Sequence, residues 1–293
     1  MRKFQGTGVA IVTPFDSDLN VDYDSLKKLV EHLIQGGIEF LVVQGTTGES
    51  VTLTHEEKYK VLEFVKEVNN GRLPIVLGHG GNNTAQLVDG FDSMDFNGVD
   101  AILSVSPYYN KPTQEGIYMH YETLAKASPV PIILYNVPGR TASNIAPATT
   151  WALAKNFDKI IGTKEAAGDL EQVAKVVRDT PDDFIVLSGD DALSVPHMSV
   201  GGDGVISVVA NAFPREFSDM IRQALNDEYE AARKGYYQLN EIIDLLFAEG
   251  NPGGIKAALK ILGVCDDHVR QPLARVSSEL FGEIREQVVR IQS

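Results

Sequence analysis

Short runs of β-branched and other apolar residues recur along the chain as far as Val209, and amphipathic segments separate them. The eight runs are Val9–Val12, Phe40–Val43, Pro74–Leu77, Ala101–Val105, Pro131–Tyr135, Lys159–Thr163, Phe184–Leu187 and Val205–Val209. Short continuous apolar runs are typical of strands buried on both faces of a parallel sheet with helical crossovers. Eight βα units predict an α/β fold, a (β/α)8 TIM barrel, and an open doubly wound sheet is the alternative.

The segments between the runs carry helix signals. Apolar residues from Leu26 to Ile34 fall on one helical face, and this pattern stops at Gly36, as expected where a helix ends. Thr54 followed by Glu57 predicts a capping box at the start of another helix.

No strand pattern follows the eighth run. Apolar residues recur at helical spacing in Leu239–Leu246 and again in Ile255–Leu262, and no linker rich in Pro, Gly or Ser interrupts the chain. We therefore predict a barrel domain over residues 1–225 and a C-terminal helical domain over residues 226–293.

Composition and charge restrict the class of protein. The 293 residues are 43% hydrophobic and 23% charged, which is a globular composition, and the formal net charge is −14. This charge opposes a nucleic-acid partner, and any anion site has to be built locally from arginine, hydroxyls and backbone amides. The single cysteine, Cys265, excludes an internal disulfide and fits a reducing, cytoplasmic compartment. The run Gly8–Val12 is too short for a signal peptide, and no run approaches membrane-spanning length.

Active sites of parallel barrels lie where the strands end, so the residues that follow each run are the candidates for chemistry. Thr46 and Thr47 follow the second run between two glycines, and their hydroxyls and amides suit a carboxylate or phosphate. Taken alone, this segment reads better as an ordinary glycine-rich turn. Tyr108 and Tyr109 follow the fourth run, where packing is the safer interpretation of that piece alone.

The fifth and sixth runs end in more specific chemistry. Tyr135 stands at the end of the fifth run and Arg140 follows shortly after, so a phenol for proton relay lies near a cation that can bind a carboxylate. Lys164 ends the sixth run before Glu165. Only a desolvated lysine has enough free amine to attack a carbonyl. The alternative is a lysine whose stem packs while its head reaches solvent or Glu165. The joint occurrence of Thr47, Tyr135 and Lys164 predicts imine chemistry.

Signals for a metal or a nucleotide cofactor are weak. The chain has no HExxH or paired-cysteine motif, and its six histidines are scattered. Asp190 and Asp191 follow the seventh run, where adjacent acids more often cap a helix than bind a cation. Gly201–Gly204 precedes the eighth run and lacks GxGxxG spacing, so we interpret it as a turn.

The motifs GTTGE, PYYNKPTQEG, YNVPGRT and KEAAGD occur in this order, and over essentially the whole chain the sequence resembles the dihydrodipicolinate synthase family. The resemblance implies a (β/α)8 barrel with a C-terminal helical domain and no cofactor or metal. It implies condensation of pyruvate with L-aspartate 4-semialdehyde, in lysine and diaminopimelate biosynthesis. It also implies a homotetramer built as a dimer of dimers.

The resemblance assigns roles to particular residues. Lys164 forms the imine with pyruvate, Tyr135 relays protons, and Thr47 links Tyr135 to Tyr109, which comes from a neighbouring subunit. Further substrate contacts are implied for Thr46, Thr47, Arg140, Gly189 and Ile206, with Arg140 receiving the semialdehyde carboxylate. Sialic acid lyases resemble this pattern but lack the arginine.

A regulatory site is also implied, with departures. The residues that match members binding lysine at a dimer interface are Ser50, His55, Asn82 and Tyr108. Lys58 and Gln86 stand where such members often carry histidine and glutamate, which makes feedback inhibition by lysine doubtful because a carboxylate is missing. Ala142, Ala167 and Gly254 also depart from the residues more common in the family, which are Gly, Ser or Thr, and Pro respectively, without removing a catalytic group.

Two other functions fit the same residues. A pyruvate-dependent Schiff-base aldolase or lyase acting on a sugar acid would form the same adduct with a different second substrate. A barrel that keeps the pocket only to sense a keto acid or amino acid is the third candidate, and the intact lysine, tyrosine and threonine argue against it.

Overall fold

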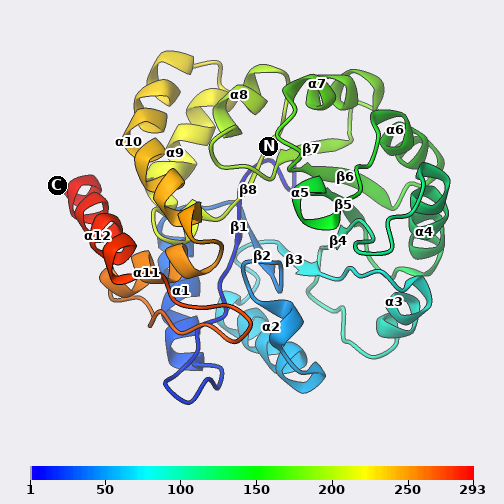
Figure 1. Ribbon diagram of the computed structural model, residues 1–293. Helices are drawn as coiled ribbons and strands as arrows, with labels where there is room; N and C mark the ends of the chain where they lie inside the picture. Colours follow the sequence, from blue (N-terminus) through cyan, green and yellow to red (C-terminus); the bar gives the residue numbers. More distant parts are fainter. Residues whose placement is uncertain (1) are drawn as a thin grey trace.

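Eight parallel strands close into a barrel in the order in which they occur along the chain (Figure 1). The structure is a computed structural model that describes residues 2–293. The strands are β1 (Gly6–Ala10), β2 (Phe40–Val43), β3 (Ile75–Gly78), β4 (Ala101–Val105), β5 (Ile132–Asn136), β6 (Ile160–Glu165), β7 (Ile185–Ser188) and β8 (Gly204–Ser207). The prediction of a (β/α)8 barrel is confirmed.

Helices surround the strands and continue beyond them. They are α1 (Tyr23–Gln35), α2 (His55–Asn69), α3 (Thr84–Phe91), α4 (Gln114–Ala127), α5 (Pro138–Thr141), α6 (Pro147–Asn156), α7 (Leu170–Asp179), α8 (Ser194–Ser199), α9 (Pro214–Leu225), α10 (Tyr229–Ala248), α11 (Gly253–Ile261) and α12 (Ser278–Gln292). Two short 3-10 turns are η1 (Ser50–Thr52) and η2 (Val209–Asn211). The capping box of Thr54 and Glu57 at the start of α2 is present as predicted.

The helices that follow α9 gather on one side of the barrel. Figure 1 shows α10, α11 and α12 together at the orange and red end of the chain, and α10 packs along α9. The apolar residues of α10 face inward as predicted, with Leu239, Ile242 and Leu246 completely buried. Among residues 2–293, no helix combines the length and the apolar composition that crossing a membrane requires.

Alternate residues of the strands enter two different cores. In β2, Phe40 and Val42 belong to the cluster inside the barrel, and Leu41 and Val43 belong to the larger cluster beneath the helices. Because both faces of the strands are largely buried, the strand sequences are mostly apolar and do not alternate between apolar and polar residues. This property made eight strands recognisable in the sequence.

Three strands differ from the prediction by two residues or more at one end. β6 continues through Lys164 to Glu165, where we expected it to end at Thr163. The eighth strand ends at Ser207, because the backbone amides of Val208 and Val209 donate to the buried carboxylate of Asp191 at 3.0 and 3.1 Å. The first strand spans Gly6–Ala10, where we expected Val9–Val12, and the amide of Val12 donates to a side-chain oxygen and leaves the sheet. In β1 and β8 a side chain replaces the sheet partner that an apolar run would otherwise predict.

Candidate active site

A cavity of about 460 Å³ opens at the carboxyl ends of the strands. Strand ends and the loops that follow them supply most of its wall, and α5, the end of α10 and Asn251 just beyond it supply the rest. The lining residues include Thr46, Thr47, Tyr135, Arg140, Lys164, Gly189, Asp191, Phe247 and Asn251. The barrel and the helical segment beyond it therefore share this cavity.

Lys164 lies near the end of β6, beside Tyr135 of β5 in the strand register. Its Nζ is 4.5 Å from the centre of the Tyr135 ring, and both residues are buried. Within residues 2–293 the Lys164 ammonium has no ion pair or hydrogen bond. Glu165 does not pair with Lys164, because its carboxylate faces Asn136 and Gln172 instead. Lys164 is thus available to a ligand in the cavity.

Gly189 is the first residue after β7, and it lies against the side chain of Lys164. A Cβ at this position would lie 2.9 Å from Lys164 Cε and 2.6 Å from the Cβ of Ala166. Carbon atoms that are not bonded approach to about 3.5 Å at closest without repulsion. The absence of a side chain at Gly189 therefore makes room for the stem of Lys164.

Thr47 is buried, and its Oγ1 accepts a hydrogen bond from Asn251 Nδ2 at 3.0 Å. Thr46 is exposed and lies on the wall that this cavity shares with a second one. Two neighbouring hydroxyls near a lysine suit the carboxylate of a keto acid. Asn251 was missed by the sequence analysis, since a single asparagine before a proline carries no distinctive signal.

Arg140, Ile206 and Tyr109, which were also predicted for the site, do not lie beside Lys164 in the way that Tyr135 does. Arg140 lies in α5 and is exposed at the rim of both cavities. Ile206 is buried inside the barrel, and Val208 forms the cavity wall at this strand. Tyr109 is 88% exposed with a left-handed backbone (φ 71°). Within one chain the structure does not bring Tyr109 to the site.

The second cavity, of about 770 Å³, adjoins the first. It brings together all of the residues predicted for regulation, which are Ser50, His55, Asn82 and Tyr108, together with Lys58 and Gln86. Burial lowers the pKa of the Lys58 ammonium, which has no ion pair within residues 2–293. Asp89 is the one carboxylate among the described lining residues.

A buried polar network lies at the ends of β5 and β6, the strands that carry Tyr135 and Lys164. Asn136 Nδ2 donates to Glu165 at 2.8 Å, Gln172 Nε2 donates at 3.0 Å, and the backbone amide of Ala167 donates at 3.0 Å. Burial raises the pKa of Glu165 to about 7 despite these donors. The network joins β5 to β6 one residue beyond Tyr135 and Lys164, so it fixes their relative height.

The two acids after β7 have separate roles. Asp190 accepts hydrogen bonds from the amides of Ala192 and Leu193, which precede α8, so it does not cap this helix and the predicted capping role is wrong. Asp191 does not cap the helix, because one of its oxygens holds the end of β8. Burial raises the pKa of Asp191. Among residues 2–293, no group of three or more His, Cys, Asp or Glu side chains is arranged to hold a metal ion.

Comparisons with known proteins agree with one another. A profile described as the dihydrodipicolinate synthetase family matches residues 3–291. The chain is 52% identical over 284 residues to a 4-hydroxy-tetrahydrodipicolinate synthase of Flavobacterium psychrophilum, with 97% of each chain covered. It is similar to the crystal structure of dihydrodipicolinate synthase from Aquifex aeolicus (40% identity, TM-score 0.95, 99% and 98% covered). It is also similar to the chloride-inhibited dihydrodipicolinate synthase of Acinetobacter baumannii complexed with pyruvate (38% identity, TM-score 0.95, 99% of each covered).

Proposed function

The chain belongs to the dihydrodipicolinate synthetase family, and on this premise we propose that its cavity condenses pyruvate with L-aspartate 4-semialdehyde to 4-hydroxy-tetrahydrodipicolinate. The observation that carries the proposal is Lys164, a buried lysine that has no ion pair among residues 2–293. Its Nζ lies 4.5 Å from the centre of the Tyr135 ring in a cavity lined by threonines. A lysine in such a position is suited to attack a carbonyl carbon.

Each step assigns a task to a residue of the cavity. The free amine of Lys164 attacks the keto carbon of pyruvate, and the resulting carbinolamine loses water to give the imine. Tyr135 carries the protons for this exchange, since its ring lies beside the lysine. Thr46 and Thr47 bind the pyruvate carboxylate through their hydroxyls and the backbone amides of their loop.

The imine then acts as an electron sink. Loss of a methyl proton gives an enamine, whose carbon attacks the aldehyde of the semialdehyde and regenerates the imine. Arg140 at the rim receives the carboxylate of this second substrate, because a guanidinium binds a carboxylate through two hydrogen bonds. Attack of the substrate amine on the imine carbon closes the ring and releases Lys164.

Tyr109 belongs to the site of a neighbouring subunit in this proposal. Its ring is 88% exposed, and its left-handed backbone projects it from the loop after β4. A tyrosine with this exposure is suited to contact a second copy of the chain. We therefore propose a homotetramer, a dimer of dimers, in which Tyr109 reaches Thr47 across the dimer interface. The single cysteine, free and buried, supports a cytoplasmic location.

Borohydride reduction in the presence of pyruvate tests the imine. Mass mapping should locate the added pyruvate on Lys164, and an unmodified Lys164 would disprove the mechanism. An aldolase acting on a sugar acid would trap the same adduct, so turnover of L-aspartate 4-semialdehyde decides between the two activities. Residual turnover in Lys164→Ala equal to that of the wild type would exclude imine catalysis.

Weak response to lysine is the regulatory part of the proposal. The second cavity contains the Lys58 ammonium and Gln86 among its polar groups, with Asp89 as its described carboxylate. A cationic effector meets a like charge there, which weakens its binding. An activity titration with L-lysine should show little inhibition at millimolar concentrations, and strong inhibition would contradict this expectation.

A further inference from the structure

The segment that follows α10 contacts the loop between β2 and α2. This loop carries Thr46 and Thr47, and the contacts come from Asn251, Lys256 and Arg270. All three contacting residues lie beyond the last barrel helix, α9, which ends at Leu225. The described contacts therefore connect the threonine loop to a part of the chain about two hundred residues away.

Asn251 determines how the Thr47 hydroxyl is used. Its Nδ2 donates to Thr47 Oγ1 at 3.0 Å, so the hydroxyl acts as the acceptor in this bond. A threonine hydroxyl has one proton to donate. Because Asn251 supplies the donor here, the proton of Thr47 stays available on the cavity side, where Lys164 also lies.

Asn251 itself is buried and lines the same cavity, with 9% of its surface exposed. Its Oδ1 has no hydrogen-bond partner within residues 2–293. A buried acceptor without a partner is unfavourable unless a ligand or water supplies a donor. The position of Asn251 thus costs free energy, which a role in the site would explain.

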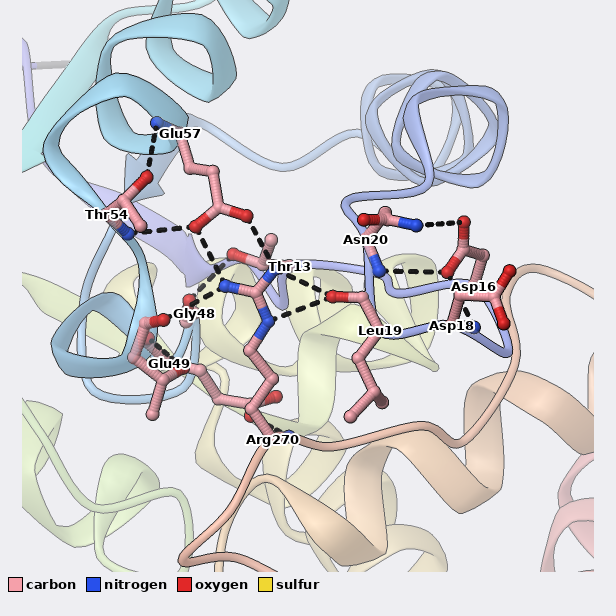
Figure 2. Close-up of polar contacts among 11 residues, drawn as sticks. Thr13, Asp16, Asp18, Leu19, Asn20, Gly48, Glu49, Thr54, Glu57 and Arg270 are labelled. Carbon is pink, nitrogen blue, oxygen red and sulfur yellow. Dashed lines mark hydrogen bonds and ion pairs between the residues drawn. The ribbon is translucent and has the colours of Figure 1, made fainter.

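Glu49 anchors the other end of the loop. Its side chain and that of Lys256 are both fully buried and form an ion pair. The second oxygen of Glu49 accepts from the Arg270 amide at 2.9 Å. Figure 2 shows the Arg270 guanidinium between the carboxylate of Glu57 and the carbonyl of Leu19, which it contacts at 2.6 and 2.7 Å.

The loop needs these anchors because its backbone is strained. Gln44 and Glu49 flank the threonines and both have left-handed conformations, with φ of 61° and 52°. A residue other than glycine pays a free-energy cost in this region and stays there only when its surroundings hold it. Thr13 also holds the loop, through a hydrogen bond from its hydroxyl to the carbonyl of Gly48 at 2.7 Å (Figure 2).

We infer that the helical segment beyond the barrel is part of the substrate site, and that Asn251 is a positioning residue that directs the Thr47 proton into the cavity. This inference rests on the proposed function, because that function supplies the pyruvate carboxylate or a tyrosine phenol as the acceptor of the hydrogen bond from the Thr47 hydroxyl. Lys256 and Arg270 hold the loop in place, and Asn251 makes the Thr47 hydroxyl oxygen the acceptor of their hydrogen bond.

The test is Asn251→Asp, which keeps the shape of the side chain and reverses the polarity of the hydrogen bond. The new carboxylate accepts the Thr47 proton and adds negative charge near the pyruvate carboxylate. We expect kcat/KM for pyruvate to fall about 100-fold, with at least a tenfold rise in KM. Asn251→Ala removes the donor without reversing the bond and should cost about tenfold. Asn226→Asp at the exposed end of α9 is the control for charge and should match the wild type.

The pH profile separates positioning from a structural defect. The carboxyl introduced by Asn251→Asp is buried beside the pyruvate carboxylate, and both effects raise its pKa above the ordinary value of about 3.9. The protonated carboxyl can donate to Thr47, so the deficit of Asn251→Asp should shrink as pH falls from about 8.5 to about 5.5. A deficit that does not change with pH would overturn the inference, as would unchanged kinetics. Should Asn251→Asp fail to unfold cooperatively, Asn251→Ala decides, and an unchanged pyruvate KM in that variant overturns the inference.

Borohydride trapping keeps the two proposals distinguishable. If the wild type is trapped on Lys164 while both Asn251 variants keep wild-type kinetics, the imine mechanism stands and the positioning role fails. If the wild type is not trapped, both proposals fail together. Trapping in all variants, with slower trapping in Asn251→Asp at high pH, supports the inference.

Discussion

Replacing Gly189 with alanine tests whether the site depends on the space that this glycine leaves for Lys164. The backbone at Gly189 is not left-handed, so alanine is conformationally allowed there. The added methyl group would nevertheless lie 2.9 Å from Lys164 Cε, 3.1 Å from Lys164 Cγ and 2.6 Å from the Cβ of Ala166. The substitution therefore acts through side-chain contacts alone.

The distances set the expected magnitude. Carbon contacts at about 3.5–4.0 Å are optimal, so the methyl group overlaps its neighbours by about 1 Å. Overpacking of this kind typically costs about 1–3 kcal/mol of unfolding free energy. A displacement of about 1 Å at a reacting group can lower the rate about 100-fold. Activity should therefore fall more than stability, because the nucleophile is the side chain that has to move.

Three measurements check this reasoning: kcat/KM for pyruvate, the rate of borohydride trapping on Lys164, and denaturant unfolding. Gly282→Ala is the matched control, since nothing lies within 4 Å of a Cβ there and the position is inside α12. It should keep full activity and gain up to about 1 kcal/mol of stability. Ala166→Gly in the Gly189→Ala background removes the shortest contact and should restore part of the activity. Wild-type kinetics in Gly189→Ala, or no gain in the double variant, would refute the argument.

Three further outcomes are expected. Lys256→Met leaves the Glu49 carboxylate buried without its partner, so the unfolding free energy should fall by about 3–5 kcal/mol in denaturant titrations. Lys60→Met, which breaks an exposed ion pair, should change the unfolding free energy little. Equal effects of the two substitutions would contradict the role of the buried pair. Burial raises the pKa of Glu165 from 4.5 to about 7, so the folded protein retains a proton that the unfolded chain has lost. Stability then declines as pH rises through this window, by up to about 3 kcal/mol, and Glu165→Gln should remove this decline. Tyr109→Phe and Lys164→Ala should each be inactive alone and regain activity when mixed, because a mixed dimer contains one complete site; no recovery after subunit exchange would show that Tyr109 does not act across an interface.

The sequence allowed the barrel to be predicted because its strands are buried on both faces. β2 and β4 have the predicted bounds, since β2 is an unbroken apolar run and β4 is interrupted only by Ser104. The errors at the ends of β1 and β8 occurred where a distant side chain replaces a sheet partner. Val209 is as apolar as any strand residue, yet its amide donates to Asp191, and no local pattern announces this bond.

The residues of the candidate site likewise fall into those that a local sequence pattern indicates and those that depend on a distant partner. Lys164 and Tyr135 were found because both stand where apolar runs end, and parallel neighbours bring such ends together. Asn251 was missed because its partner, Thr47, is separated from it by about two hundred residues. Ala142 has a left-handed backbone (φ 58°) just after the short helix that carries Arg140, and an alanine gives no hint of that conformation.

The distribution of the site over the chain affects how it can fail. Strands hold Lys164 and Tyr135 at one height, because the register between β5 and β6 is fixed by backbone hydrogen bonds and by Glu165. The threonine loop has no such support from the sheet, and its left-handed residues favour another conformation once the anchors are lost. Damage to the helical segment should therefore weaken pyruvate binding before it affects the barrel. Partial unfolding of α10 and α11 would thus abolish pyruvate binding while hydrogen exchange in the strands stays slow.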